Sequence, residues 1–230
     1  MTFALRLFVA TLMLAAGAAA QARAPFIRAS GDATVSVAPD LVFVSLSVTS
    51  QGNTAAEAAD ANATATTRVI NALKQLVGAK GEVKTVGYSV FPVSRATNGV
   101  TTVAFYQATN SLQVNADDLN LGGRIIDTGA QAGATVVSGI GFGLRDPAPA
   151  RMQALKQATA RAKASAEAIA TGLGGHLGPV VSVEETGSVR AVSDTRLVAG
   201  GAAAGGGVPT PIEAGLVTVY ASVVIEAGLQ

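Results

Sequence analysis

Residues 146–175, DPAPARMQALKQATARAKASAEAIATGLGG, contain the longest run of the chain with a single structural period, and they predict one long alanine-rich helix. Asp146 and Pro147 are typical of a helix start, because a carboxylate caps free N–H groups and proline needs no hydrogen bond in the first turn. Glycines 172, 174 and 175 are typical of its end. At 1.5 Å per residue the helix would be about 40 Å long, enough to cross a sheet.

The helix has one predicted packing face, whose members recur at spacings of three and four residues. They are Met152, Leu155, Ala158, Ala162, Ala166, Ile169 and Leu173. The preceding stretch, residues 134–144, reads as a strand, and its Gly139, Gly141 and Gly143 invite close packing of another element. We therefore expect the helix to lie over these three glycines.

The other elements follow from alternation, capping signals and turns. Residues 41–49 alternate so cleanly that one strand face should be buried, and Asn53-Thr54 with Glu57 forms a capping box before a helix that ends near Gly78. Asn98-Gly99 predicts a hairpin. Further strands are expected at residues 26–37, with a bulge or bend at Gly31-Asp32, and at 82–93, 101–115, 179–185 and 216–226. Asp117-Asp118 opens a shorter helix that ends near Gly133.

These elements predict an α+β fold with a ferredoxin-like βαββαβ core. An extra N-terminal strand precedes that core, and the long helix and a C-terminal β-hairpin follow it. The simplest arrangement is one mixed sheet with helices packed on it.

The N-terminal residues 1–22 predict a secretory signal peptide, with Arg6, a short apolar run and small residues before cleavage after Ala20 or Ala22. An uncleaved anchor is the alternative. Residues 23–230 then form the domain, in which residues 188–212 read as a flexible Gly/Ala-rich loop. That loop could instead bind a partner or line a pore. The chain has no cysteine, which excludes disulfides and a lipid anchor on an N-terminal cysteine.

Charge argues against nucleic acid as a partner. Without Arg6, the mature chain holds 15 basic and 15 acidic residues, and its cations are not interleaved with aromatics.

No residue is predicted to be catalytic, to bind a cofactor or to bind a metal. His176 is the only histidine and follows the long helix, where a helix-end or surface role is expected. Asp117 and Asp118 are expected to cap a helix, and Pro39-Asp40 to form a turn, although Asp32 and Asp40 could approach one another. Gly139-x-Gly141-x-Gly143 lies inside a strand and is therefore no dinucleotide fingerprint.

Several stretches together resemble the SIMPL-domain family, which includes periplasmic immunogenic proteins and oxidative-stress-defence proteins. They are S-G-D-A-T-V-S-V-A-P-D at 30–40, T-A-A-E-A at 54–58, V-K-T-V-G-Y-S-V-F-P at 83–92, Y-Q-A-T-N at 106–110, G-I-G-F-G-L-R-D at 139–146, A-L-K-Q-A-T-A-R-A-K-A and L-G-G-H-L-G within 154–178, and T-P-I-E-A-G-L-V-T-V at 210–219. The resemblance implies an exported, homo-oligomeric, non-enzymatic protein of the periplasm. Some relatives are thought to form rings, and the family supplies no catalytic residues to transfer.

The favoured hypothesis is a structural or interaction protein that self-assembles through sheet edges and alanine-rich helical faces, with outer-membrane or other envelope association as a further expectation. The alternative is a small-ligand-binding or oxidative-stress-protection module, with a pocket near an aromatic set: Tyr88, Phe91, Phe105, Tyr106 and Phe142. A hydrolase that uses carboxylates such as Asp40 and Asp118 is a third hypothesis.

Overall fold

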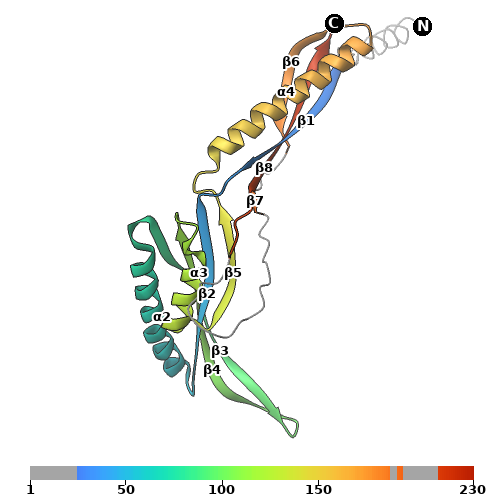
Figure 1. Ribbon diagram of the computed structural model, residues 1–230. Helices are drawn as coiled ribbons and strands as arrows, with labels where there is room; N and C mark the ends of the chain where they lie inside the picture. The colour runs from blue at the N-terminus through green and yellow to red at the C-terminus, as the bar shows by residue number, and fades with distance from the viewer. Residues whose placement is uncertain (1–24, 187–190, 194–211) are drawn as a thin grey trace, which may run out of the picture. The chain divides into compact units, whose positions relative to one another are not determined.

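The computed structural model describes residues 25–186, 191–193 and 212–230, which fall into two compact units. Of the described residues, the central unit comprises 33–157, 191–193 and 212–221, and the terminal unit comprises 25–32, 158–186 and 222–230. Three elements contribute to both units: β1 (Phe26–Val37), α4 (Ala148–Gly172) and β8 (Val217–Leu229) (Figure 1). The predicted signal peptide lies outside the described residues.

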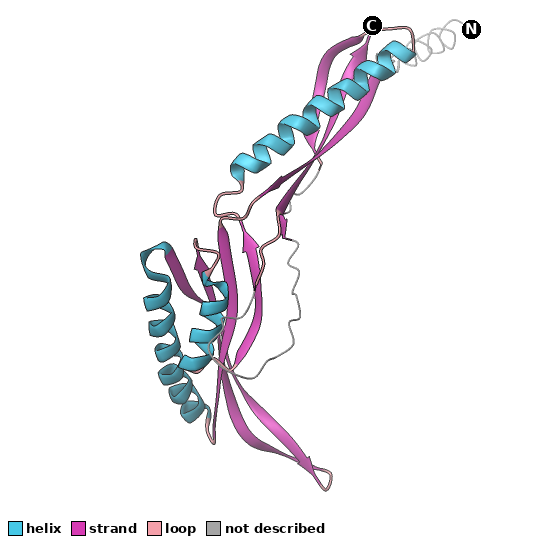
Figure 2. Cartoon of the chain, viewed as in Figure 1, coloured by secondary structure: helices cyan, strands magenta, loops and turns pink. Residues whose placement is uncertain are grey.

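The central unit holds a four-stranded sheet with two helices on one face (Figure 2). In chain order its elements are β2 (Leu41–Gly52), α2 (Ala55–Val77), a 3-10 turn η1 (Gly78–Lys80), β3 (Gly81–Thr97), β4 (Val100–Ala116), α3 (Leu121–Ala132) and β5 (Val136–Gly143). The spatial order is β3-β4-β2-β5, and every neighbouring pair is antiparallel.

The core of the central unit lies between this sheet and helices α2 and α3. The alternation of β2 predicted one buried face, and Val42, Val44, Leu46 and Val48 are indeed fully buried. They pack with the buried stripe of α2, the matching face of β4, and single residues of α3 and β5: Val69, Leu73, Val77, Leu112, Val114, Ala116, Ile125 and Phe142.

Helix α2 begins where its capping box predicted. The Glu57 N–H donates to Thr54 Oγ1 at 3.2 Å, and Glu57 Oε2 accepts from the Asn53 N–H at 2.9 Å. These reciprocal hydrogen bonds give partners to two backbone N–H groups that have none within the helix. The helix ends before Gly78, whose φ of 58° suits a residue without a Cβ.

A buried asparagine ties α2 to the sheet. Asn62 is fully buried, and its Nδ2 donates to the carbonyl of Val48 at 2.8 Å and to that of Ala108 at 3.1 Å. Its Oδ1 accepts from the Thr66 hydroxyl one turn later, at 3.3 Å. One side chain thus satisfies carbonyls of two neighbouring strands, β2 and β4, and fixes the position of the helix along them.

The terminal unit brings α4 into close contact with β1. The buried residues of α4 in this unit are all alanines at a spacing of four: Ala158, Ala162, Ala166 and Ala170. A Cβ on Gly31 would overlap backbone atoms of Ala158 and Ala162, and would lie 2.9 Å from Ala162 Cα. Only glycine on the strand and alanine on the helix allow such backbone contact.

A second four-stranded sheet takes part in both units. Its order is β1-β8-β6, with β6 at Leu177–Glu185, and β7 (Ala191–Ser193) also pairs with β8. The pairs of β6 and β7 with β8 are antiparallel. Strand β7 lies within residues 188–212, which the sequence predicted to be a loop; most of that segment lies outside the described residues.

The α+β class is confirmed, with antiparallel sheets and helices packed on them, but three details of the prediction are wrong. The described strands form two sheets rather than one mixed sheet. Gly31 lies in an unbroken strand with alternating burial, so it serves helix contact and forms no bulge. A Cβ on Gly141 would meet the ring of Phe43, and one on Gly139 would meet nothing, so these glycines do not lie beneath a helix.

The predicted packing face of α4 is also partly wrong. Met152, Ile169 and Leu173 are exposed, whereas Ala158, Ala162 and Ala166 are buried as expected. The contact with β1 selects for small side chains rather than for hydrophobic ones, because a long side chain would push the two backbones apart. A prediction from hydrophobicity alone therefore assigns some wrong residues to the packing face of α4.

We predict that Gly31→Ala lowers the free energy of unfolding by about 1–3 kcal/mol through overpacking, and that Ala162→Leu does so at the same contact. The double variant should lose less than the sum of the two losses, because one helix displacement relieves both. Urea denaturation measures all three. Gly139→Ala and the exposed Ala164→Leu are the controls, and equal losses in controls and test variants would contradict the described contact.

We predict that Asn62→Asp lowers the free energy of unfolding at neutral pH by about 2–3 kcal/mol, because a buried carboxylate would face two carbonyl oxygens. Protonation restores a donor, so the folded variant binds its proton more tightly than the unfolded one. Its deficit relative to wild type should therefore shrink as the pH falls. Exposed Asn71→Asp on the same helix is the control. A deficit that does not depend on pH would contradict this role of Asn62.

Candidate functional site

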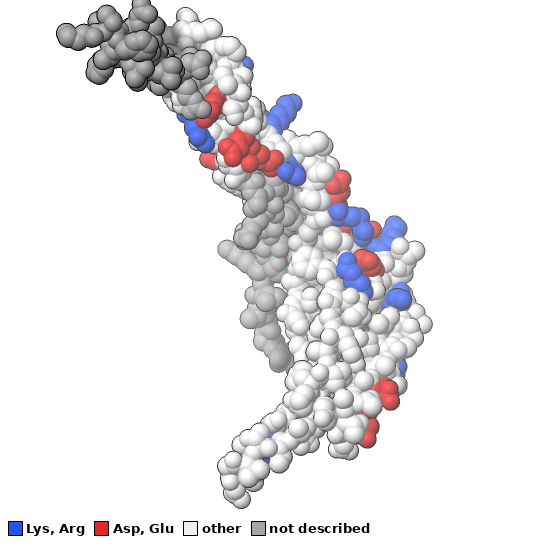
Figure 3. Space-filling model, turned by 180° about the vertical axis from the view of Figure 1, so that it is seen from behind, with Lys and Arg blue, Asp and Glu red and all other residues white. Residues whose placement is uncertain are grey.

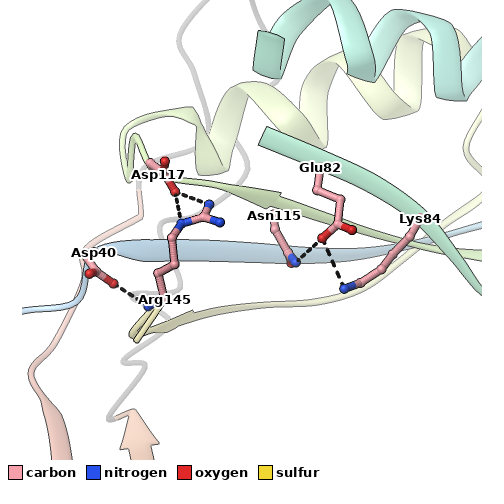
Figure 4. Close-up of polar contacts among 6 residues, drawn as sticks. All are labelled: Asp40, Glu82, Lys84, Asn115, Asp117 and Arg145. Carbon is pink, nitrogen blue, oxygen red and sulfur yellow. Dashed lines mark hydrogen bonds and ion pairs between the residues drawn. The ribbon is translucent and has the colours of Figure 1, made fainter. Parts of the chain in front are cut away.

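One polar cluster joins three connections at one end of the central sheet (Figure 4). Asp40 precedes β2, Asp117 follows β4 and Arg145 follows β5. Because β2 is antiparallel to both β4 and β5, the start of β2 meets the ends of the other two. The strand order of the sheet therefore brings these three side chains together although they are far apart along the chain.

Arg145 is the centre of this cluster. Its backbone N–H donates to Asp40 Oδ1 at 2.7 Å, and its Nε donates to Asp117 Oδ1 at 2.7 Å. Its Nη2 reaches the same oxygen of Asp117. The Asp40 N–H also donates to the Gly143 carbonyl at 3.1 Å. This arrangement holds strand ends in register, and we call it the Arg145 clamp.

The clamp changes how the carboxylates are interpreted. Asp40 and Asp117 direct an oxygen to the backbone and the guanidinium of Arg145, respectively, which is a structural use of both groups. Asp118 makes the turn before α3, where its Oδ1 accepts from the backbone N–H and the side-chain amide of Asn120, both at 3.0 Å. The N-cap residue of α3 is Asn120 and has no side-chain cap, so the capping prediction is wrong for both aspartates, and Asp118 instead shapes the turn before the helix.

The predicted start of α4 is confirmed. Asp146 Oδ1 accepts from the Ala148 N–H at 2.9 Å. His176 lies exposed after α4, and its carbonyl accepts from the Gln230 N–H at 2.9 Å. Its position is therefore that of a surface residue beside the C-terminal strand.

Within residues 25–186, 191–193 and 212–230, no three His, Asp or Glu side chains lie close enough together to hold a metal ion. In the same part of the chain, no helix is long and apolar enough to cross a membrane.

The aromatic residues proposed to line a pocket are distributed over both faces of the central sheet. Phe142 is buried in the core beneath the helices. Tyr88 and Phe91 are exposed and lie three residues apart in β3, so they point to opposite faces. The predicted pocket is therefore not supported by their placement.

The face of the central sheet opposite the helices carries polar side chains that pair across strands. Ser47 and Ser111 hydroxyls lie 3.2 Å apart, and those of Thr49 and Thr109 lie 3.3 Å apart. Near the clamp, Lys84 Nζ lies 3.2 Å from Glu82 Oε2, which also accepts from Asn115 Nδ2 at 3.4 Å (Figure 4). These contacts pair polar side chains across neighbouring strands, on a face that also carries Phe43 and the exposed Phe91.

The most unusual surface of the central unit is the end of the β3–β4 hairpin. Strand β2 pairs with β4 only as far as Tyr106, whereas β3 and β4 continue to pair up to Thr97 and Val100. Residues 93–105 thus form a two-stranded extension, which we call the ribbon, and Figure 1 shows it running past the other strands of its sheet. Within it, the side chains of Val100 and Val103 are 63% and 51% exposed.

The ribbon is also nearly free of charge. Between Lys84 and Asp117 the only charged residue is Arg95. Figure 3 accordingly shows the projecting hairpin almost entirely in white. Exposed edges normally carry several charges that discourage pairing, and isolated two-stranded hairpins are marginal in water. The sequence signal for this surface was the missing charge between two long alternating runs, and sequence reasoning overlooked it.

A comparison with protein families identifies the chain. The model of the family "SIMPL: Protein of unknown function (DUF541)" matches residues 27–227. The chain belongs to the SIMPL family. The match covers both units, and the expected resemblance is confirmed.

The chain is also similar to individual proteins, at low sequence identity. The chain is 29% identical over 164 residues to the "26 kDa periplasmic immunogenic protein" of Brucella melitensis, which covers 69% of this chain and 66% of that protein, just under two thirds of its length. It is 27% identical over 179 residues to the "Uncharacterized protein YggE" of Escherichia coli, with 76% of this chain and 73% of the relative covered.

We predict that Arg145→Met lowers the free energy of unfolding by about 0.5–1 kcal/mol, a small value because the ion pair with Asp117 is partly exposed. The loss should shrink at high salt, where charge interactions are screened. Urea denaturation at low and high salt measures both effects. Arg124→Met on the exposed side of α3 is the control, and an equal loss in that variant would contradict a specific clamp.

Proposed function

We propose that this SIMPL protein is a non-enzymatic, self-associating protein of the periplasm, and that the ribbon is one of its contact surfaces. In this proposal the βαββαβ path of the central unit, which we describe as ferredoxin-like, is the scaffold that presents the ribbon. The Arg145 clamp and Asn62 keep that scaffold rigid.

The observation that carries the proposal is the exposed, nearly uncharged ribbon. Among the described residues no third strand pairs with the ribbon beyond Tyr106, and Val100 and Val103 are exposed there. Covering Val100 and Val103 would remove apolar surface from water, which favours association. A protein partner also supplies backbone groups that can pair with the ribbon edges.

The location rests on two supports. Residues 1–22 have the pattern of a secretory signal peptide. A relative from Brucella is named as a periplasmic protein. Association with the outer membrane or another envelope component extends the same proposal.

A ligand-binding or stress-protection role has less support. The ligand-binding hypothesis requires the aromatic residues to line one pocket, but those residues lie on both faces of the sheet. The carboxylate-based hydrolase loses its support as well, because Asp40 and Asp118 have structural hydrogen bonds.

We predict that mature wild-type protein sediments as an oligomer at micromolar concentration. The double variant Val100→Lys/Val103→Lys should sediment as a monomer with an unchanged melting temperature, because both side chains are exposed outside the core. Ser30→Lys/Thr34→Lys, at exposed positions of β1, is the control and should remain oligomeric. A monomeric wild type in analytical ultracentrifugation would contradict the proposal.

A further inference from the structure

A second exposed apolar strand lies in the terminal unit. Among the described strands of its sheet, β6 is an outer one, and Val180, Val181 and Val183 are 49%, 76% and 62% exposed. The opposite outer strand, β1, exposes only polar and charged residues between its first residue and Ser36: Arg28, Ser30, Asp32, Thr34 and Ser36. Charged edges resist pairing, so β6 is the edge of this sheet that is suited to pairing.

The ribbon and β6 differ in charge in a complementary way. Arg95 is the only charged residue of the ribbon, whereas the valines of β6 are followed directly by Glu184 and Glu185. Two ribbons brought together would place like charges near one another, and so would two β6 edges. A ribbon against a β6 edge instead pairs a cation with an acidic strand end.

We propose that the ribbon of one copy docks along the β6 edge of a second copy, in a head-to-tail interface. This inference rests on the proposed self-association and specifies its geometry. The two contacting surfaces are different, so the interface is heterologous, and each copy has one ribbon to offer and one edge to accept a ribbon. Repetition of such an interface gives a closed ring or an open filament rather than an isolated two-fold dimer.

A second copy fits the ribbon better than a lipid surface does. The end of the ribbon carries Ser94, Arg95, Thr97 and Asn98, whose polar groups would lose hydrogen bonds in hydrocarbon. A strand edge from another chain satisfies backbone groups while it covers the valines. In β6 the flanking glutamates would be repelled by anionic headgroups, which argues against lipid there as well.

The test uses two full-length mature variants, each with one surface disabled. The ribbon variant is Val100→Lys/Val103→Lys, and the edge variant is Val181→Lys/Val183→Lys. All four substituted side chains are more than half exposed, so both variants should keep the wild-type melting temperature. Each variant alone should be monomeric. A 1:1 mixture should form a dimer of twice the monomer mass and grow no further, because it retains one intact ribbon and one intact edge.

A charge reversal tests the pairing of residues. Arg95→Glu, placed in the edge variant, should weaken the mixed dimer. Glu184→Arg, added to the ribbon variant, should restore it, whereas exchange of the exposed Glu167 on α4 for Arg should not.

The outcomes separate this inference from the proposed function. An oligomeric wild type whose two variants are monomeric but form no mixed dimer would overturn the head-to-tail interface alone. An edge variant that remains oligomeric would overturn the role of β6. A monomeric wild type that floats with phosphatidylethanolamine–phosphatidylglycerol vesicles, and loses flotation in the ribbon variant, would overturn both proposals and assign the ribbon to lipid.

Discussion

The contact between Gly31 of β1 and the backbone of α4 is the constraint on which the terminal unit depends. At this distance the strand residue cannot carry a Cβ, and the helix residues around it cannot be larger than alanine. Buried alanines continue at every fourth residue from Ala158 to Ala170. Because small side chains bury little area each, stability must come from dense backbone packing over the length of the helix. The alanine-rich composition of α4 is therefore a consequence of geometry.

The central unit solves the same problem with larger side chains. Leu46, Leu73, Leu112 and Ile125 fill the space between sheet and helices, and Asn62 adds a directional contact that apolar packing lacks. Hydrophobic packing tolerates small shifts along a strand, whereas two hydrogen bonds to fixed carbonyls do not. The clamp at Arg145 restrains the other end of the same sheet. Asn62 thus holds β4 at Ala108, close to Tyr106 where the ribbon begins, and the clamp holds the opposite end of β4.

Local features of this fold were predictable from the sequence, and long-range features were not. The capping box at Thr54, the cap at Asp146 and the alternation of β2 depend on neighbours a few residues away, and each is found where it was expected. The packing face of α4 was misassigned because size, not hydrophobicity, decides it. The clamp was missed because Arg145 and Asp117 are 28 residues apart and meet only through strand order. The ribbon was missed because its signal is an absence of charge.

The uncharged hairpin has a further consequence, for the chain before it folds. From Thr85 to Ala116 the chain carries one charge and long runs of strand-forming residues, which is the composition of segments that form intermolecular β-structure when unfolded. Pro92 interrupts this stretch and removes one backbone donor from β3. Folding of the central unit and misassembly therefore compete for the same residues. Rapid closure at Asn98-Gly99 is then as important for the yield of soluble protein as for its final architecture.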